Sequence, residues 1–206
     1  MKRCWFFGDS FTRGDMCYAG DTYYNMTYHV GCKRWTEIVS DYLNMKEENW
    51  AWGGNSNLHI LYDLIRNVNI FEKNEWVIVG DTRPNRLISF KENGDIRNQI
   101  NDPHFGYKKG DKVVLDYILE EIIPNEKYYQ DYYETMFLEI LKSLEKRGVN
   151  TLFWKHTDFW YPNPKLESIQ QHTNYKIKDL HYSWNAHAKK AEIIISKINK
   201  EEKQIL

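Results

Sequence analysis

The chain has 206 residues and a formal net charge of −1, with 42% hydrophobic and 28% charged residues. This length fits one domain, and the composition is that of a globular protein and excludes a disordered one. The charge balance lacks the basic excess by which proteins bind nucleic acid or anionic membranes, so we expect neither partner.

The first half of the chain predicts strands that alternate with helices. An apolar run at 3–7 indicates a buried strand, and the segment 11–32, rich in Gly, Asp, Thr and Asn, indicates a long loop. Apolar residues recur at helical spacing over about 33–45. A second strand is predicted at 49–52, and Asn57 is expected to cap the helix that follows it.

The second half continues this alternation around an insertion. A β-branched run at 76–79 predicts a third strand. The stretch 81–112 looks irregular, but its Asn93-Gly94 pair is a strong turn signal, so we expect a small hairpin inserted there. The remaining predicted elements are a short helix at 113–123, a long helix at about 126–147, a strand at 149–154, a loop at 156–183 and a final helix at 184–199.

This order of elements predicts an α/β fold with a mostly parallel sheet and helices on both faces. In such sheets, sites form beyond the carboxyl ends of the strands. The segments in which chemistry is expected are therefore 8–20, 53–57, 80–86 and 155–183.

The first candidate catalytic residue is Ser10, in the Gly8-Asp9-Ser10 run that follows the first strand. A serine at a strand-to-helix turn can present its hydroxyl to a cleft, and backbone N–H groups nearby can receive an oxyanion. The tripeptide is short, and a serine at this place also fits a helix cap.

The second candidate is the Asp179-Leu180-His181 run before the final helix. Serine hydrolysis needs a base with a pKa near neutral and a carboxylate that fixes its tautomer. Asp179 and His181 are two residues apart, so on an extended segment they point to the same side. A surface Asp and His in a polar loop is the alternative.

Four motifs in this order resemble the four blocks of the SGNH (GDSL-type) hydrolases. They are Gly8-Asp9-Ser10, the run from Ala51 to Asn57, Gly80-Asp81-Thr82-Arg83 and Asp179-Leu180-His181. The resemblance implies a flavodoxin-like three-layer α/β/α sandwich, with a single domain over 1–206 and the insertion at about 81–112. It also implies serine hydrolysis of acyl esters without a cofactor.

The resemblance implies roles for single residues. Ser10 would be the nucleophile, and its backbone N–H and that of Gly54 would donate to the oxyanion. His181 would be the general base, and Asp179 would orient it. An acetyl ester, on a carbohydrate or on another small molecule, is the expected substrate.

Two departures from the family pattern leave alternatives open. Thr82 stands where the family has an oxyanion-donating Asn, so the Thr82 hydroxyl, Arg83, Asn55 or Asn57 are candidates for the third donor. The family spacing is usually Asp-x-x-His, whereas Asp-x-His looks like a variant of members that act in polysaccharide O-acetylation. An O-acetyltransferase and a non-catalytic glycan- or partner-binding protein of this fold therefore stay open.

Other residues have rival interpretations. His187 in the final helix is a rival base. Arg83 and Arg86 can bind an anionic substrate group or pair with local carboxylates, and aromatic residues at 154–161 can stack on sugars or fill the core. His156, Asp158, Asp179 and His181 are the residue types that bind transition metals, but no spacing is diagnostic of a metal site.

The cysteine count and the hydropathy of the sequence indicate in which compartment of the cell the protein is expected. Three cysteines exclude a fully paired disulfide framework and favour a reducing compartment. The apolar run at the start is too short for a signal peptide, and no run reaches transmembrane length. We therefore expect a cytoplasmic protein, and a virus-encoded protein fits as well.

Overall fold

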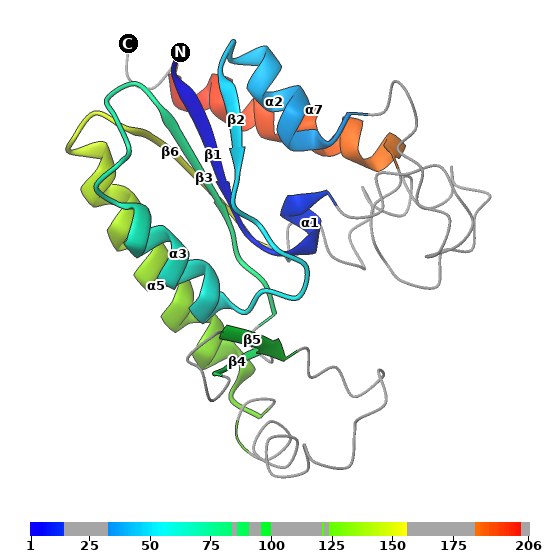
Figure 1. The fold of residues 1–206 in the computed structure, drawn as a ribbon, viewed down its shortest axis with the longest axis vertical. Coiled ribbons are helices and arrows are strands. Elements are labelled where there is room, and N and C mark those ends of the chain that lie inside the picture. The colour runs from blue at the N-terminus through cyan, green and yellow to red at the C-terminus, as the bar shows by residue number, and fades with distance from the viewer. Residues whose placement is uncertain are drawn as a thin grey trace.

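The structure is a computed structural model, and it describes residues 1–14, 33–83, 86–90, 96–99, 121, 124–155 and 184–202. Its centre is a four-stranded sheet that lies between two pairs of helices (Figure 1). The α/β class and the three layers expected from the sequence are confirmed.

All four strands of this sheet are parallel. They are β1 (Arg3–Phe7), β2 (Lys46–Asn49), β3 (Trp76–Gly80) and β6 (Asn150–Trp154), in the spatial order β2-β1-β3-β6. Within the register, Cys4 lies between Glu47 of β2 and Trp76 of β3. The carboxyl ends of β1, β3 and β6 therefore meet at one edge of the sheet.

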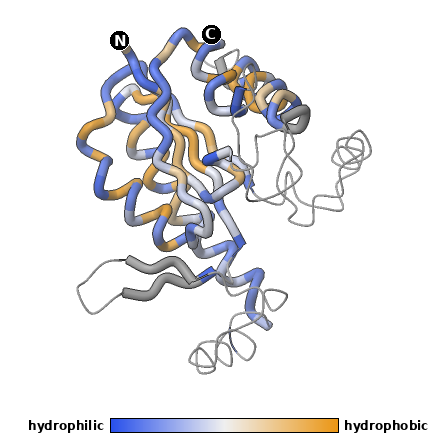
Figure 2. Tube along the Cα trace, turned by 45° about the vertical axis from the view of Figure 1, so that its right-hand side comes forward, coloured by the Kyte–Doolittle hydropathy of each residue, from blue (hydrophilic) through white to orange (hydrophobic). Residues whose placement is uncertain are grey.

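The side chains of β1 alternate between the two faces of the sheet. Cys4 and Phe6 pack with α2 (Trp35–Tyr42) and α7 (Trp184–Glu202). Trp5 and Phe7 pack on the other face with α3 (Asn57–Asn67) and α5 (Glu126–Glu145). Both faces are covered, which explains why the inner strands β1 and β3 have nearly continuous apolar sequences. Figure 2 shows the apolar residues gathered on the strands and on the inward faces of the helices.

Two details of the expected elements are wrong. The second strand is β2 at Lys46–Asn49 and was expected at 49–52. It is the edge strand of the described sheet and is only partly buried, so its charged sequence carries no apolar signal. Ser56 is the N-cap of α3, since its side chain accepts from the N–H of His59, whereas Asn57 is the first helical residue.

The expected hairpin is present within the insertion. β4 (Leu87–Phe90) and β5 (Ile96–Gln99) are antiparallel and form a small separate sheet (Figure 1). Most of the expected loop at 11–32, most of the expected helix at 113–123 and the expected loop at 156–183 lie outside the described residues.

The amino-terminal end of the sheet is fastened by one buried carboxylate, that of Glu75. It accepts from the indole N–H of Trp5 at 2.9 Å and from the backbone N–H groups of Arg3 and Glu72 at 3.2 and 3.1 Å. The Arg3 guanidinium lies 3.3 Å away as well. These donors meet the hydrogen-bonding needs of the buried carboxylate. Removal of the carboxylate would leave the same N–H groups without partners.

We expect Glu75→Ala to lower the free energy of unfolding by about 3 kcal/mol, the usual cost of removing one partner of a buried ion pair. Urea denaturation followed by circular dichroism measures it. Glu72→Ala is the matched control, because the Glu72 side chain pairs with Lys2 at the surface, and such pairs contribute about 0.5 kcal/mol. Equal losses in the two variants would contradict this account of Glu75.

Candidate active site at the carboxyl edge of the sheet

The segments after β1 and β3 and the loop after β2 carry the residues that the sequence analysis singled out. Asp9 and Ser10 follow β1, and Thr82 follows β3. Gly54 and Asn57 lie at the start of α3, beyond β2. The structure brings these three segments into contact through the hydrogen bonds described below.

Ser10 is the first residue of α1 (Ser10–Arg13), a helix of one turn (Figure 1). Asp9 is the N-cap and has an extended backbone, and its Oδ1 accepts from the N–H of Phe11 at 2.9 Å. Gly14 has φ +82° and closes the turn by donating its N–H to the carbonyl of Ser10. These bonds fix the backbone of Ser10 on both sides.

Gly8 lets α1 pack closely against the end of β1, and its carbonyl binds the loop after β2. A Cβ on Gly8 would come within 2.0 Å of the Thr12 hydroxyl oxygen, so only glycine fits here. The Gly8 carbonyl accepts from the side-chain amide of Asn55 at 2.9 Å. Since Asn55 follows Gly54 directly, this bond sets the Gly54 peptide beside the Ser10 turn. Gly54 itself has φ +78°, a backbone conformation that favours glycine.

Asn57 and Thr82 hold each other by two hydrogen bonds. The Thr82 N–H donates to Asn57 Oδ1 at 2.8 Å, and Asn57 Nδ2 donates to the Thr82 carbonyl at 2.7 Å. Both residues are buried. The pair fastens the start of α3 to the end of β3, which the expectation of a helix cap at Asn57 had not foreseen.

The side chains of Thr82 and Arg86 converge on Asp9. Thr82 Oγ1 donates to Asp9 Oδ2 at 2.9 Å, and Arg86 Nη1 donates to the same oxygen at 2.6 Å. A hydroxyl has one hydrogen, so Thr82 would have to leave Asp9 before it donated to an oxyanion. Arg86 pairs with a local carboxylate, one of the two roles that the sequence left open for it.

Not every candidate residue from the sequence analysis lies in the described part of the chain. Asp179 and His181 lie outside the described residues, as do His156 and Asp158. Arg83 is described and partly buried beside Thr82. His187 is completely buried in α7, where its Nδ1 accepts from the N–H of Trp35 at 3.4 Å, so it belongs to the core.

The described residues include neither a cluster of metal-ligating side chains nor a reactive thiol. No group of three His, Cys, Asp or Glu side chains in these ranges lies close enough to hold a metal ion. Burial raises the pKa of the Cys4 thiol, which keeps it protonated and unreactive. None of the described helices is both long enough and apolar enough to span a membrane.

Among known proteins, the chain is similar to several proteins with solved structures. No protein-family model matches the chain, and no curated protein does. The chain is similar to the acetyl xylan esterase Est2A of Butyrivibrio proteoclasticus, with 10% identity and a TM-score of 0.49 over 97% of this chain and 64% of that one. It is also similar to the psychrotrophic esterase EstA of a Pseudoalteromonas species, with 12% identity and a TM-score of 0.46 over 98% of this chain and 100% of that one.

A lipase/acylhydrolase of Enterococcus faecalis is similar as well, with 10% identity and a TM-score of 0.40 over 98% of this chain and 97% of that one. The chain therefore spans less than two thirds of the length of Est2A and nearly the whole length of the other two. At these identities the likeness concerns the fold, and the function has to be argued from the residues of this chain.

We expect Arg86→Met to lower the free energy of unfolding by about 2 kcal/mol, because it leaves the buried Asp9 carboxylate without its ion-pair partner. Chemical denaturation measures the loss. The matched control is Lys33→Met, which removes a cation from the surface pair with Asp41 and should cost less than about 0.5 kcal/mol. A stability loss from Arg86→Met no larger than the control's would show that the Asp9 pair contributes nothing.

Proposed function

We propose that this protein is an SGNH-type serine esterase that hydrolyses an acetyl or other short acyl ester, with a carbohydrate ester as the substrate class. The observation that carries the proposal is the placement of Ser10. It begins α1 at the carboxyl edge of β1, and hydrogen bonds from Asn55 to Gly8 and from Thr82 to Asp9 hold the other two motif segments against it.

In the proposed reaction, Ser10 Oγ attacks the ester carbonyl carbon while His181 takes the hydroxyl proton, and Asp179 holds the imidazole in the right tautomer. The carbonyl oxygen becomes an oxyanion, which the backbone N–H groups of Ser10 and Gly54 receive. The C–O bond to the alcohol then breaks, and the alcohol leaves with the proton from His181. Water attacks the acyl-enzyme by the same path and releases the acid and Ser10.

Trp52 supports a carbohydrate as the alcohol part of the substrate. Its side chain is 56% exposed although it lies two residues before Gly54. The Arg13 guanidinium lies over its ring at 5.3 Å from the centroid and comes from the same short helix as Ser10. An indole held in place at the edge of the site offers a flat apolar surface on which a sugar ring can stack.

The Asp179-Leu180-His181 spacing favours a second candidate, an O-acetyltransferase that uses the same serine. In that reaction a sugar hydroxyl replaces water in the second step. The product would then depend on an added sugar acceptor, whereas a hydrolase consumes the acetyl donor at the same rate in water alone.

Covalent labelling of Ser10 tests the nucleophile. A fluorophosphonate probe forms a bond from serine Oγ to phosphorus and expels fluoride, while the base takes the serine proton. We expect one adduct by intact mass on the wild type and none on Ser10→Ala, because only an activated serine reacts. Ser143→Ala, at an exposed serine of α5, should label like the wild type. A wild type that binds glycans without an adduct would favour the non-catalytic alternative.

The role of Thr82 is tested by Thr82→Val, which removes the hydroxyl and keeps the shape. Because that hydroxyl donates to Asp9 in the structure, we expect kcat to fall by less than about tenfold. Steady-state hydrolysis of an acetyl ester measures it. A loss of roughly 100- to 1000-fold, the usual effect of removing an oxyanion donor, would instead assign Thr82 as the third donor.

A further inference from the structure

Arg86 is held at the candidate site by one nitrogen of its guanidinium. Its Nη1 donates to Asp9 Oδ2 at 2.6 Å, and its backbone N–H donates to the carbonyl of Arg83 at 3.2 Å. Within the described part of the chain, Arg86 makes no other hydrogen bond or ion pair. A guanidinium carries five N–H donors, so four of them have no partner among the described residues.

The pair with Asp9 does not explain why this residue is an arginine. A guanidinium grips a carboxylate best with two parallel N–H···O bonds, one to each oxygen. Asp9 offers only one oxygen to Arg86, since its Oδ1 binds the N–H of Phe11. For one bond to one oxygen the ammonium group of a lysine is sufficient. The planar fork of Arg86 therefore suits a second anionic group.

The unpartnered donors of Arg86 lie beside the proposed nucleophile and are open to a ligand. The Asp9 carboxylate binds Arg86 with one oxygen and the N–H of Phe11 with the other. Ser10 stands between Asp9 and Phe11 in the sequence, so one carboxylate joins the guanidinium to the start of α1. The Arg86 side chain is 14% exposed, and none of its unpartnered nitrogen atoms is fully buried.

The charges around this guanidinium favour an anion as the ligand. The motif segments 8–14, 52–57 and 80–83, taken together with Arg86, hold three arginines and two aspartates: Arg13, Arg83, Arg86, Asp9 and Asp81. Both carboxylates are buried, and each accepts a hydrogen bond from another side chain. Arg13 is exposed, and the other two arginines are partly exposed. These segments therefore present a cationic face, although the chain as a whole has a net charge of −1.

We propose that Arg86 is a specificity-determining residue and that it selects an ester whose alcohol part carries a carboxylate, that is, an ester of an acidic sugar. The inference rests on the esterase function proposed above and narrows its substrate class. With Nη1 on Asp9, the edge formed by Nε and Nη2 stays free to bind both oxygens of the substrate carboxylate. The cation of Arg13, in the same short helix as Ser10, attracts the same group from a greater distance.

This contact affects binding more than chemistry. The substrate carboxylate has the same charge before and during attack by Ser10, so Arg86 binds the ground state and the transition state equally well. Such an interaction lowers KM and leaves kcat unchanged. Because the guanidinium is partly exposed, salt screens the attraction.

Two matched esters test the inference, the monoacetates of glucuronic acid and of glucose. The two sugars differ only at C6, where the first has a carboxylate and the second a hydroxymethyl group. We measure kcat and KM for each ester and take the ratio of the two kcat/KM values in one enzyme sample, acidic over neutral. A loss of folded enzyme lowers both values alike and leaves this ratio unchanged.

For the wild type we expect a ratio of at least about 10, which comes from KM, since a charge-assisted pair of hydrogen bonds contributes that much or more. The ratio should fall as the salt concentration rises from about 20 to about 500 mM.

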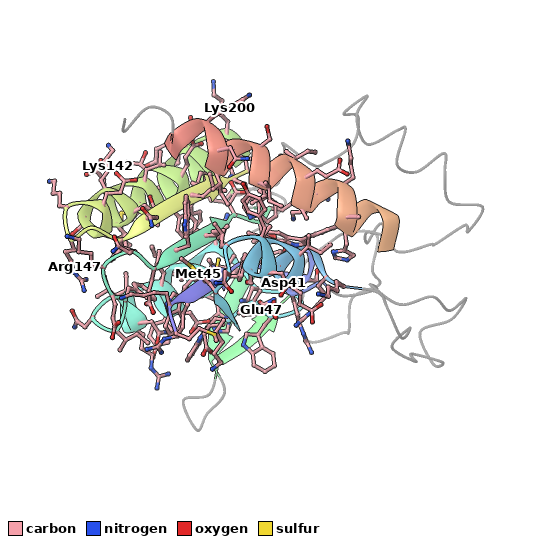
Figure 3. The ribbon with its side chains drawn as sticks, turned by 90° about the horizontal axis from the view of Figure 1, so that it is seen from above. Asp41, Met45, Glu47, Lys142, Arg147 and Lys200 are labelled. Atoms are coloured by element: carbon pink, nitrogen blue, oxygen red, sulfur yellow. The ribbon has the colours of Figure 1, made fainter. Side chains whose placement is uncertain are left out.

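Variants of Arg86 separate the fork from the charge. Arg86→Met removes both, and we expect the ratio to fall to about 1. Arg86→Lys keeps a cation for Asp9 and so preserves the turn, but it lacks the fork, and we expect the ratio to fall by about threefold or more. Lys142→Met is the control, because the Lys142 side chain points away from α5 at the surface (Figure 3) and pairs with Glu139. It also removes one positive charge, and it should keep the wild-type ratio.

The results that would overturn the inference differ from those that would refute the esterase. A wild type that hydrolyses the neutral ester as well as the acidic one would overturn the inference and leave the esterase standing. So would a ratio that neither Arg86 variant changes, because the carboxylate would then be recognised elsewhere. A wild type that labels at Ser10 with the fluorophosphonate but hydrolyses neither monoacetate would also overturn it. A wild type that neither labels at Ser10 nor hydrolyses either ester would refute the proposed function, and the role of Arg86 with it.

Discussion

The carboxylate of Asp9 joins the segments of the candidate site at the carboxyl end of the sheet. One oxygen caps the short helix that Ser10 begins, and the other accepts from Thr82 after β3 and from Arg86 before β4. Each bond reaches a different segment, so the group fixes the end of β1 against the end of β3 and against the β4–β5 hairpin. Because the carboxylate is buried, none of these donors can be exchanged for water without a cost in stability.

The two ends of the sheet are held by the same kind of interaction. At the amino-terminal end the buried carboxylate of Glu75 collects donors from β1 and from the turn before β3. At the carboxyl end Asp9 does so for the segments of the candidate site. Between them the strands bury mainly apolar side chains on both faces. The apolar layers supply most of the stability, while the two carboxylates determine how the strand ends lie relative to one another.

Prediction from the sequence succeeded where local pattern and topology decide the structure. The strands β1, β3 and β6 have continuous apolar runs, and parallel order alone predicts that Ser10, Gly54 and Thr82 meet at one edge. It failed for β2, because the exposed edge strand carries charged residues. It left a local carboxylate open as a partner of Arg86 without identifying Asp9, and it missed the Asn57–Thr82 contacts, because both depend on tertiary placement. Lys189 and Lys190 are adjacent in the sequence, yet the first faces solvent and the second lies in the core, a difference that composition cannot show.

The unusual Thr82 fits the same constraint. An amide donor works only at hydrogen-bond distance, so it must line the site and restrict the shape of the acyl group. The Thr82 hydroxyl donates its hydrogen to Asp9 instead, and Asn57 holds the Thr82 backbone by two further hydrogen bonds. In the proposed reaction the backbone N–H groups of Ser10 and Gly54 therefore receive the oxyanion, and Thr82 acts on the site by fixing Asp9 against the end of β3.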